Sequence, residues 1–353
     1  MPALSVSPIV VALEHLEVEH DAVMAAPVTE VGVLSLVEAL SQVPDPRKPR
    51  GIRHGVLAVL LVAACAVLTG ARSFAAIAEY AHDAGAAVLA ALGVGAVVPH
   101  ESTIRRILQR VDASALEAAL RSWALTQLEA QPSPTGTPRR EQRRVLAVDG
   151  KTLRGAHVRA ADGGGCLPHL VSVLDQASGV VLGQVQVERK GSEITAFPTL
   201  LDRLDLGEVL VTADALHTQR GHAGYLHQRG GHYLMTVKAN QPTLLARLRA
   251  LPWTQIGVAA RERARGHGRV ETRTISVVSL HPCPDLGGEF FPHATQAIKL
   301  VRRRRPLRPG SKWKTETVYA ITSLTGADAD PGLLARWIRG HWSRKTACTG
   351  SAM

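Results

Sequence analysis

The stretch Val145-Leu146-Ala147-Val148-Asp149-Gly150-Lys151-Thr152 decides the fold, because its apolar run ends abruptly in an aspartate. A second stretch, Val209 to His217, has the same form and reaches its aspartate at Asp214. Short apolar runs rich in β-branched residues predict buried strands. An acidic side chain at the exit of a buried strand is costly to desolvate, so it usually faces a cleft or a cation.

Two such strands can bring Asp149 and Asp214 together at one edge of a sheet. Carboxylates are preferred ligands of Mg²⁺, and paired carboxylates hold the ions that assist phosphoryl transfer. A single aspartate at such a position is often only a turn former or a helix cap. A matched pair in a basic chain favours a site for Mg²⁺ or Mn²⁺.

The composition indicates a folded protein with an anionic partner. The chain has 353 residues, 46% of them hydrophobic, which is enough for two or three domains with cores of their own. Its 41 Lys and Arg residues against 30 acidic residues give a formal net charge of +11. This balance favours nucleic acid as a partner over a generally basic surface without a specific one.

The cysteines and the apolar segments of the sequence indicate the compartment in which the protein is expected. The four cysteines form no CxxC pair, so we expect neither a zinc ribbon nor a disulfide framework, and a reducing cytosol is the simplest location. The N-terminus lacks the pattern of a secretory signal. The apolar run from Val56 to Leu68 is shorter than the roughly 18 residues of a membrane span, so we expect a buried core helix and no membrane association.

The first part of the chain has a helical pattern. We expect a loosely ordered lead-in over residues 1–30 and an all-α domain over residues 31–130. Helices are predicted at Val31–Val43, Ile52–Thr69, Ser73–Tyr80 and Ile104–Val111. Residues 131–144, rich in proline and then arginine, are the predicted linker to the next domain.

From Val145 the pattern changes to that of an α/β fold. Strands are predicted at Val145–Val148, His169–Leu174, Val180–Val187, Val209–Ala213 and His232–Val237. Helices follow the third, fourth and fifth strands, and the first of these helices has Pro198 near its first turn. This order is that of a ribonuclease H-like domain, a mixed sheet with helical cover.

This catalytic domain is expected in two parts, residues 145–252 and 319–353, around a β-rich insertion over residues 253–318. The insertion carries a basic loop that begins with four consecutive arginines, Arg302 to Arg305. Blocks of like charge lie in solvent or against a polyanion. The loop is therefore expected to face DNA.

A phosphate-binding loop is excluded as the role of Gly150-Lys151-Thr152. The motif GxxxxGK[ST] needs a glycine where Val145 stands. We therefore expect no nucleotide triphosphatase.

Six motifs occur in a fixed order: AVDGKTLRGA, GSEITAFPTLLDRL, VTADALHTQ, YLMTVKANQPTL, GHGRVETR and RWIRGHW. Together they resemble the bacterial insertion-sequence transposases of the DDE class, in the ISAs-type group with the H-repeat-associated proteins. The segments that begin PDPRKPRGIRHG and PHESTIRRIL resemble the N-terminal domain associated with that family. The resemblance covers about residues 35 to 342.

The resemblance implies a ribonuclease H-like core that cuts and joins DNA at transposon ends with two divalent metal ions. Asp149 matches the first aspartate of the family and Asp214 the second. The expected partner is double-stranded DNA, bound by a homodimer at the nucleoid in the cytoplasm, with no small-molecule cofactor.

The third acid of this family lies on a helix after the insertion, in a pattern resembling Arg-x-His-Trp-x-Ile-Glu-Asn. Arg339 to Trp342 matches its start, but no Glu or Asp follows Asp330. We hypothesise a frameshift after Trp342, because one codon choice for Ser343 to Met353, read in another frame, encodes a peptide resembling the missing segment. Sequencing of the locus must then find an intact downstream frame; programmed frameshifting would give the same pattern.

Two glutamates are candidates for the third acid within the chain. Glu271 is the first, and the alternative is a salt-bridged strand residue of the insertion or a contact to DNA. Glu193 is the weaker candidate and is expected to be structural.

The expected function is that of a DDE transposase, impaired by loss of the glutamate. The alternative is an inactive DNA-binding remnant that occupies transposon ends, and a small-molecule hydrolase fits the charge poorly. For His217 a polar role at a helix N-terminus is equally open. Residues expected to contact DNA or support the site are Lys151, Arg154, His217, Gln219, Lys238, Asn240, Arg269, Arg303 and Arg304.

Overall fold

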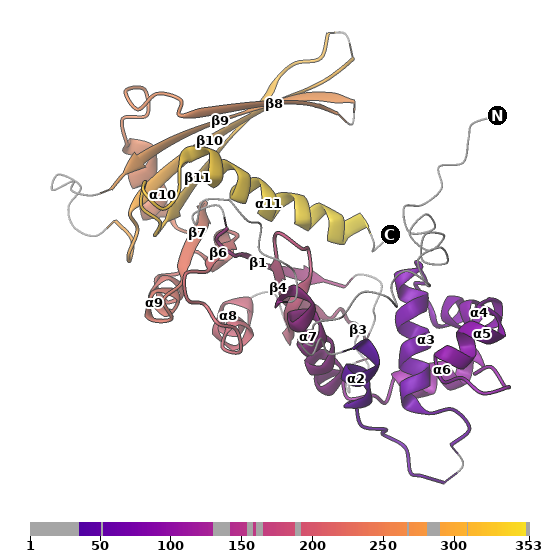
Figure 1. Ribbon diagram of the computed structural model, residues 1–353. Coiled ribbons are helices and arrows are strands. Elements are labelled where there is room, and N and C mark those ends of the chain that lie inside the picture. The colour runs from indigo at the N-terminus through magenta and orange to yellow at the C-terminus, as the bar shows by residue number, and fades with distance from the viewer. Residues whose placement is uncertain are drawn as a thin grey trace, which may run out of the picture. The chain divides into compact units, whose positions relative to one another are not determined.

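The protein has two compact units, which divide between Pro132 and Ser133 (Figure 1). They are seen in a computed structural model. The structure describes residues 35–50, 52–129, 142–153, 158–159, 165–187, 192–266, 268–280, 290–308 and 310–350.

All regular secondary structure in the described part of the N-terminal unit is helical, as predicted. Its helices are α2 (Leu36–Ser41), α3 (Val56–Leu68), α4 (Phe74–Asp83), α5 (Gly85–Ala91), α6 (Glu101–Leu108) and α7 (Ala113–Glu129). The apolar helix α3 packs Val59 and Val62 against Ile77 and Ile104, so it is a core helix. Among the described residues, no helix is long and apolar enough to cross a membrane.

The sequence patterns did not predict α5 and α7. In α7 the alanines and leucines are spread around the helix, so its sequence lacks a clear apolar face. The N-cap of α4 is as predicted, since Ser73 Oγ accepts a hydrogen bond of 3.1 Å from the Ala76 N–H.

The C-terminal unit is built on a nine-stranded sheet in the order β5-β4-β1-β6-β7-β11-β10-β9-β8. Its strands are β1 (Val145–Thr152), β4 (His169–Asp175), β5 (Val181–Val187), β6 (Leu210–Ala213), β7 (His232–Val237), β8 (Ala260–Gly266), β9 (Arg269–Ser279), β10 (Gln296–Pro306) and β11 (Lys314–Thr322). The short strands β2 (Val158–Arg159) and β3 (Gly165–Cys166) form a separate pair.

The strand directions confirm the ribonuclease H-like fold. The strands β1, β4 and β5 are antiparallel neighbours, and β6 and β7 then add in parallel to β1. Parallel neighbours need a crossover connection, which the helices between these strands provide.

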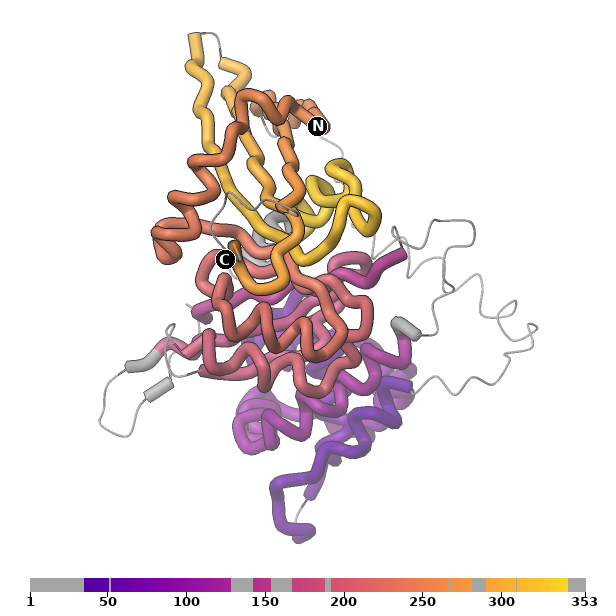
Figure 2. Tube along the Cα trace, turned by 90° about the vertical axis from the view of Figure 1, so that its left-hand side faces the viewer, coloured from indigo at the N-terminus to yellow at the C-terminus, as the bar shows by residue number. Residues whose placement is uncertain are grey.

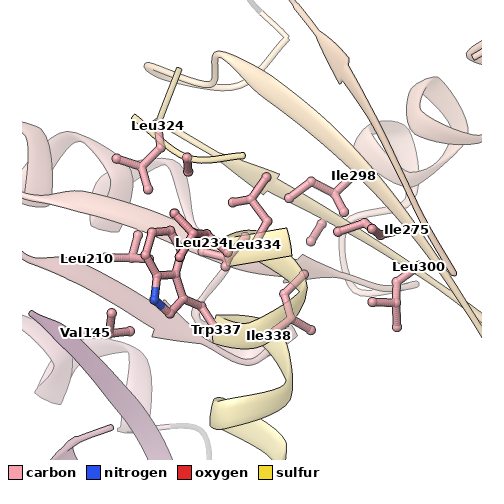
Figure 3. Packing of buried hydrophobic residues seen from close by; sticks show 13 residues of the cluster. Val145, Leu210, Leu234, Ile275, Ile298, Leu300, Leu324, Leu334, Trp337 and Ile338 are labelled. Carbon is pink, nitrogen blue, oxygen red and sulfur yellow. The ribbon is translucent and has the colours of Figure 1, made fainter. Parts of the chain in front are cut away.

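The helices of this unit are α8 (Glu193–Leu201), α9 (Arg220–Gln228), α10 (Pro242–Ala250) and α11 (Pro331–Gly350), with a 3₁₀ turn at Ala215–His217. Helix α11 packs on one face of the sheet, where Trp337 lies against Val145 and Leu210 (Figure 3). Figure 1 shows α8 and α9 on the other face.

The predicted start of α8 was wrong. The helix begins at Glu193, so Pro198 lies in its interior rather than near its first turn. A proline inside a helix leaves the carbonyl four residues earlier without its N–H donor. Here that carbonyl, of Ile194, lies 3.0 Å from His222 Nε2, and the tautomer of His222 with a proton on Nε2 supplies the replacement donor.

The region predicted as an insertion continues the main sheet. Strand β11 pairs antiparallel with β7, with Tyr319 opposite Val237, and β10, β9 and β8 follow in turn. We call strands β8 to β11 the β-arm. Figure 2 shows the turn between β10 and β11, in gold, at the far end of the arm from the rest of this unit.

Candidate active site and DNA interface

Asp149 and Asp214 lie level with each other on neighbouring strand ends. In the parallel pair β1–β6, Val148 is opposite Ala213, so the next residues of the two strands are the aspartates. Side chains alternate across a strand, and Val145 and Leu210, four residues before each aspartate, both pack against α11. The two aspartates therefore project from the same face of the sheet, the face that α11 covers.

Asp214 also caps the turn that follows it. Its Oδ1 accepts a hydrogen bond of 2.9 Å from the Leu216 N–H. Two predicted site residues brace the same turn: Asn240 Nδ2 donates to the Ala215 carbonyl at 2.5 Å and Gln219 Nε2 donates to the Leu216 carbonyl at 2.9 Å. These side chains support the loop that presents Asp214.

Two of the predicted cationic residues, Lys151 and Lys238, lie at the same edge. Lys151 is two residues after Asp149 on the same face of β1, and its Nζ is buried without a hydrogen-bond partner among the described residues. Lys238, directly after β7, is exposed. Arg154 lies outside the described residues. A buried ammonium without a partner is costly, so Lys151 fits an anionic ligand at this edge.

Helix α11 reaches the part of β6 that precedes Asp214. His341 Nδ1 lies 3.2 Å from Thr212 Oγ1, two residues before Asp214 on the same face of β6. The helix continues to Gly350, so position 345 lies in it, one turn after His341 along the chain. In the pattern quoted above, position 345 is that of the third acid, and this chain has Lys345 there.

Within the described part of the chain, no group of three or more His, Cys, Asp or Glu side chains could hold a metal ion. The carboxylates that this part offers at the edge are Asp149 and Asp214. Two carboxylates with water and substrate phosphates are a sufficient donor set for Mg²⁺, which seldom takes an all-protein cage.

The prediction of Glu271 as a third acid was wrong. Four strands separate β9 from β1, so this residue lies roughly 24 Å across the sheet from Asp149 at the usual strand spacing. It is 7% exposed and pairs with Arg302 at 2.5 Å and Arg273 at 2.7 Å. Burial raises the pKa of Glu271, but Arg302 and Arg273 outweigh it and hold that pKa below its usual range. Glu271 is a salt-bridged strand residue, which is the alternative role given for it above.

His217 is not positioned to contact DNA, because its side chain is fully buried. Its ring lies 5.3 Å from that of Phe197, and its Nε2 is 3.5 Å from Oε2 of Glu193. The other carboxylate oxygen of Glu193, Oε1, is 2.7 Å from His169 Nε2. Burial raises the pKa of Glu193, but His217 and His169 outweigh it, so that pKa is lowered overall. Burial thus argues against a contact of His217 with DNA, and a supporting role for this residue stays a prediction.

The β-arm extends past the edge at which the aspartates lie. Asp214 is level with Thr236 on β7, which pairs with Ala320 on β11. Trp313 is seven residues further out than Ala320, or roughly 24 Å at the rise of an extended strand. With the sideways offset between the strands added, the end of the β-arm at Trp313, called the tip, lies about 25 Å from the aspartates. This distance is less than the length of one turn of B-DNA.

The tip of the arm is strongly basic. Arg303 and Arg305 lie over the ring of Trp313, at 5.2 and 5.1 Å from its centroid. A neighbouring pocket is lined by Arg269, Arg304, Arg305, Pro306, Ser311, Lys312 and Lys314. The predicted contacts Arg269, Arg303 and Arg304 thus lie together, beside an aromatic ring on which a base can stack.

A second basic pocket was not predicted from the sequence. It lies between α11 and the β8–β9 pair, and its charged lining is Arg261, Glu262, Arg273, Arg336 and Arg339. Glu262 pairs with Arg339 and, at 3.9 Å, with Arg273, so positive charge remains in excess. These arginines come from three separate elements, and only the fold brings them together.

Two stretches of the chain match known families. Residues 37–124 match the family described as "DDE_Tnp_1-associated", and residues 140–343 match the family described as "Transposase DDE domain". The second match spans more than half of the chain.

Among relatives, the chain is 29% identical over 320 residues to "Putative transposase YncI" of Escherichia coli O157:H7, covering 88% of this chain and 77% of the relative. It is 28% identical over 323 residues to "H repeat-associated putative transposase YhhI" of Escherichia coli strain K12, covering 87% and 79%. A cryo-EM structure of the piggyBac transposase synaptic complex with hairpin DNA matches with a TM-score of 0.40 at 10% identity, covering 88% of this chain and 66% of that one.

The fold is that of a ribonuclease H-like domain with a helical domain before it. The chain belongs to the DDE transposase family.

Proposed function

We propose that this protein cleaves double-stranded DNA at the ends of an insertion sequence and joins those ends to a target. The observation that carries the proposal is the level pair of Asp149 and Asp214 on one face of the sheet, at the edge past which the basic β-arm extends.

Asp149 and Asp214 would hold the divalent cation, Mg²⁺ or Mn²⁺. A bound cation of this kind activates an attacking water or hydroxyl and stabilises the leaving oxygen of a phosphodiester. Asn240 and Gln219 keep the Asp214 turn in place. Lys151 supplies a buried positive charge beside Asp149, suited to a phosphate of the bound strand.

The DNA would lie along the α11 face and reach the tip of the β-arm. The two basic pockets provide sequence-independent contacts to phosphates, while Trp313 offers a surface for stacking. The separation of about 25 Å allows one duplex to contact both the aspartates and the tip. A homodimer at the nucleoid stays a prediction, which light scattering with and without DNA checks.

The second candidate function is DNA binding without cleavage. It is favoured by Lys345, which stands where the family pattern has glutamate, and by the lack of a third acid near the pair in the described part. The frameshift after Trp342 stays a prediction for sequencing of the locus.

One experiment separates the two functions. A labelled DNA fragment carrying the ends of the genomic element is incubated with the full chain and Mg²⁺ or Mn²⁺, and nicking and strand transfer are measured. Asp149→Ala and Asp214→Ala should each reduce nicking at least 100-fold without loss of DNA binding, and Asp205→Ala, at an exposed turn, serves as the control.

Binding without any nicking by the wild-type chain would support the second function. Nicking that survives both alanine substitutions would overturn the first.

A further inference from the structure

A buried carboxylate lies behind the two aspartates and touches the segment that follows each of them. We propose that Glu193 is a positioning residue, which sets the separation of Asp149 and Asp214 and so the affinity of the site for its cation. This inference rests on the proposed function, since it concerns the same site.

The first contact of Glu193 is with β1, directly after Asp149. A Cβ on Gly150 would overlap all three atoms of the Glu193 carboxylate group. The carboxylate therefore lies against the backbone of β1, and only glycine permits this approach. Because Gly150 is bonded to Asp149, a shift of the carboxylate is transmitted to the aspartate.

His169 holds the carboxylate in this place. Its Nε2 lies 2.7 Å from Oε1 of Glu193, and its Nδ1 lies 2.8 Å from Oγ1 of Thr152. Thr152 and His169 face each other in the β1–β4 register. The contact thus links α8, β4 and the last residue of β1.

The second contact is with the turn that Asp214 caps. His217 ends this turn and lies 3.5 Å from Oε2 of Glu193, within ion-pair range but outside hydrogen-bonding geometry. Neither ring nitrogen of His217 has a hydrogen-bond partner in the described part of the chain. The ring is fully buried beside Phe197, with the charged carboxylate of Glu193 as its neighbour.

Glu193 cannot itself bind the cation held by the aspartates. Adjacent residues of a strand point to opposite faces, so Gly150 faces Glu193 while Asp149 faces α11. The sheet lies between the carboxylate of Glu193 and the proposed ion. This placement separates a positioning role from that of a third acid.

Small shifts of metal-binding carboxylates have large effects. Loss of a residue that orients a metal ligand typically weakens metal binding 10- to 100-fold, and a misplacement of about 1 Å reduces rates about 100-fold. A carboxylate that only stabilised the fold would lower the melting temperature without a specific effect on metal affinity.

The test is the affinity of the full chain for Mn²⁺, measured by electron paramagnetic resonance of the free ion. The variants are Glu193→Gln and Gly150→Ala, and the control is Asp175→Asn. Asp175 is also buried, lies at the opposite end of the β1–β4 pair, and pairs with Arg144 at 3.1 Å. Thermal unfolding and DNA affinity in EDTA are measured alongside.

We expect Glu193→Gln and Gly150→Ala to raise the dissociation constant for Mn²⁺ by 10- to 100-fold. DNA affinity in EDTA should stay within about twofold, because the basic pockets are unchanged. Asp175→Asn should lower the melting temperature comparably and leave Mn²⁺ affinity unchanged. If Glu193→Gln does not fold, the same rise in the dissociation constant for Mn²⁺ is required of Gly150→Ala.

A Mn²⁺ affinity within twofold of wild type in these variants would overturn the positioning role, as would an equal loss in Asp175→Asn. Failure of the proposed function looks different. In that case the wild-type chain would bind no Mn²⁺, or Asp149→Ala would bind it as well as wild type, and both inferences would fall together.

Discussion

Two glutamates of this protein are buried, lie on or beside the same sheet, and have lowered pKa values, yet their surroundings differ. Glu271 in the β-arm is held by arginines that are about one-quarter exposed and can turn to solvent. Glu193 lies between two buried histidines and the backbone of β1. Burial and a shifted pKa are common to both residues, so they do not identify a functional acid. The two residues are distinguished by the segments that their carboxylates contact.

The largest difference between the two regions should appear when a methyl group is added to a glycine in each. Gly150→Ala forces a Cβ into the Glu193 carboxylate and should destabilise the C-terminal unit by about 3 kcal/mol, the upper end for overpacking. Gly266→Ala, at the end of β8 in the arm, meets nothing within contact distance and should change stability by less than about 0.5 kcal/mol.

Urea unfolding followed by tryptophan fluorescence measures both variants, because Trp253, Trp313, Trp337 and Trp342 lie in this unit. Equal effects of the two substitutions would show that the approach of Glu193 to β1 is not tight.

The place of the third acid can be tested by adding one. Lys345→Glu restores the glutamate that the family pattern has at this position, and it should tighten Mn²⁺ binding about tenfold, or about 1.4 kcal/mol. Glu271→Gln should leave Mn²⁺ affinity unchanged, because four strands separate β9, which carries this residue, from β1. The same Mn²⁺ titration measures both, and a loss of affinity in Glu271→Gln would restore the rejected candidate.

The β-arm should matter for DNA and not for the cation. Arg304→Ala and Lys312→Ala each remove one expected phosphate contact from the tip, which should weaken DNA binding several-fold, or about 1 kcal/mol. The slope of log affinity against log salt should fall by about 0.9 for each contact. Fluorescence anisotropy at several salt concentrations measures the slope, with Arg203→Ala as an exposed control. An unchanged slope would remove the tip from the DNA interface.

The smallest expected difference is in the response to acid. Both glutamates have a folded pKa below the unfolded value, so each contributes stability that is present above the unfolded pKa, near 4.5, and lost as pH falls through the folded pKa. Glu193→Gln and Glu271→Gln should each flatten the acid limb of the stability curve. Salt of 1 M should weaken the contribution of Glu271 more, because its arginines are partly exposed. A steeper acid limb in either variant would contradict the assigned pKa directions.

The strands of the ribonuclease H-like core could be predicted because their local pattern and their burial agree. The runs at β1, β6 and β7 are largely apolar and buried, while β4 and β5 are rich in valine and leucine with polar residues between them. The two aspartates could be found for the same reason, since each directly follows such a run. Strand β8 could not, because Ala-Arg-Glu-Arg-Ala-Arg-Gly is exposed along nearly its whole length and has no apolar face.

The errors share one physical cause, which is that partners distant in the chain decide the role of a residue. Glu271 was a candidate for metal binding from the sequence, but in the fold its carboxylate pairs with Arg302. His217 looked like a contact to DNA, but packing against Phe197 buries it. Pro198 suggested a helix start, and the donor from His222 that permits an earlier start lies on another helix. No local pattern encodes these contacts.

The central claim is that Asp149 and Asp214 share one divalent cation, and a Mn²⁺ titration of the full chain tests it most directly. The samples are wild type, Asp149→Asn, Asp214→Asn and the double variant. If the carboxylates share an ion, each single substitution should weaken binding nearly as much as the double one, because effects at one site are not additive. Two independent losses that add up in the double variant, or no loss in either single variant, would contradict the account.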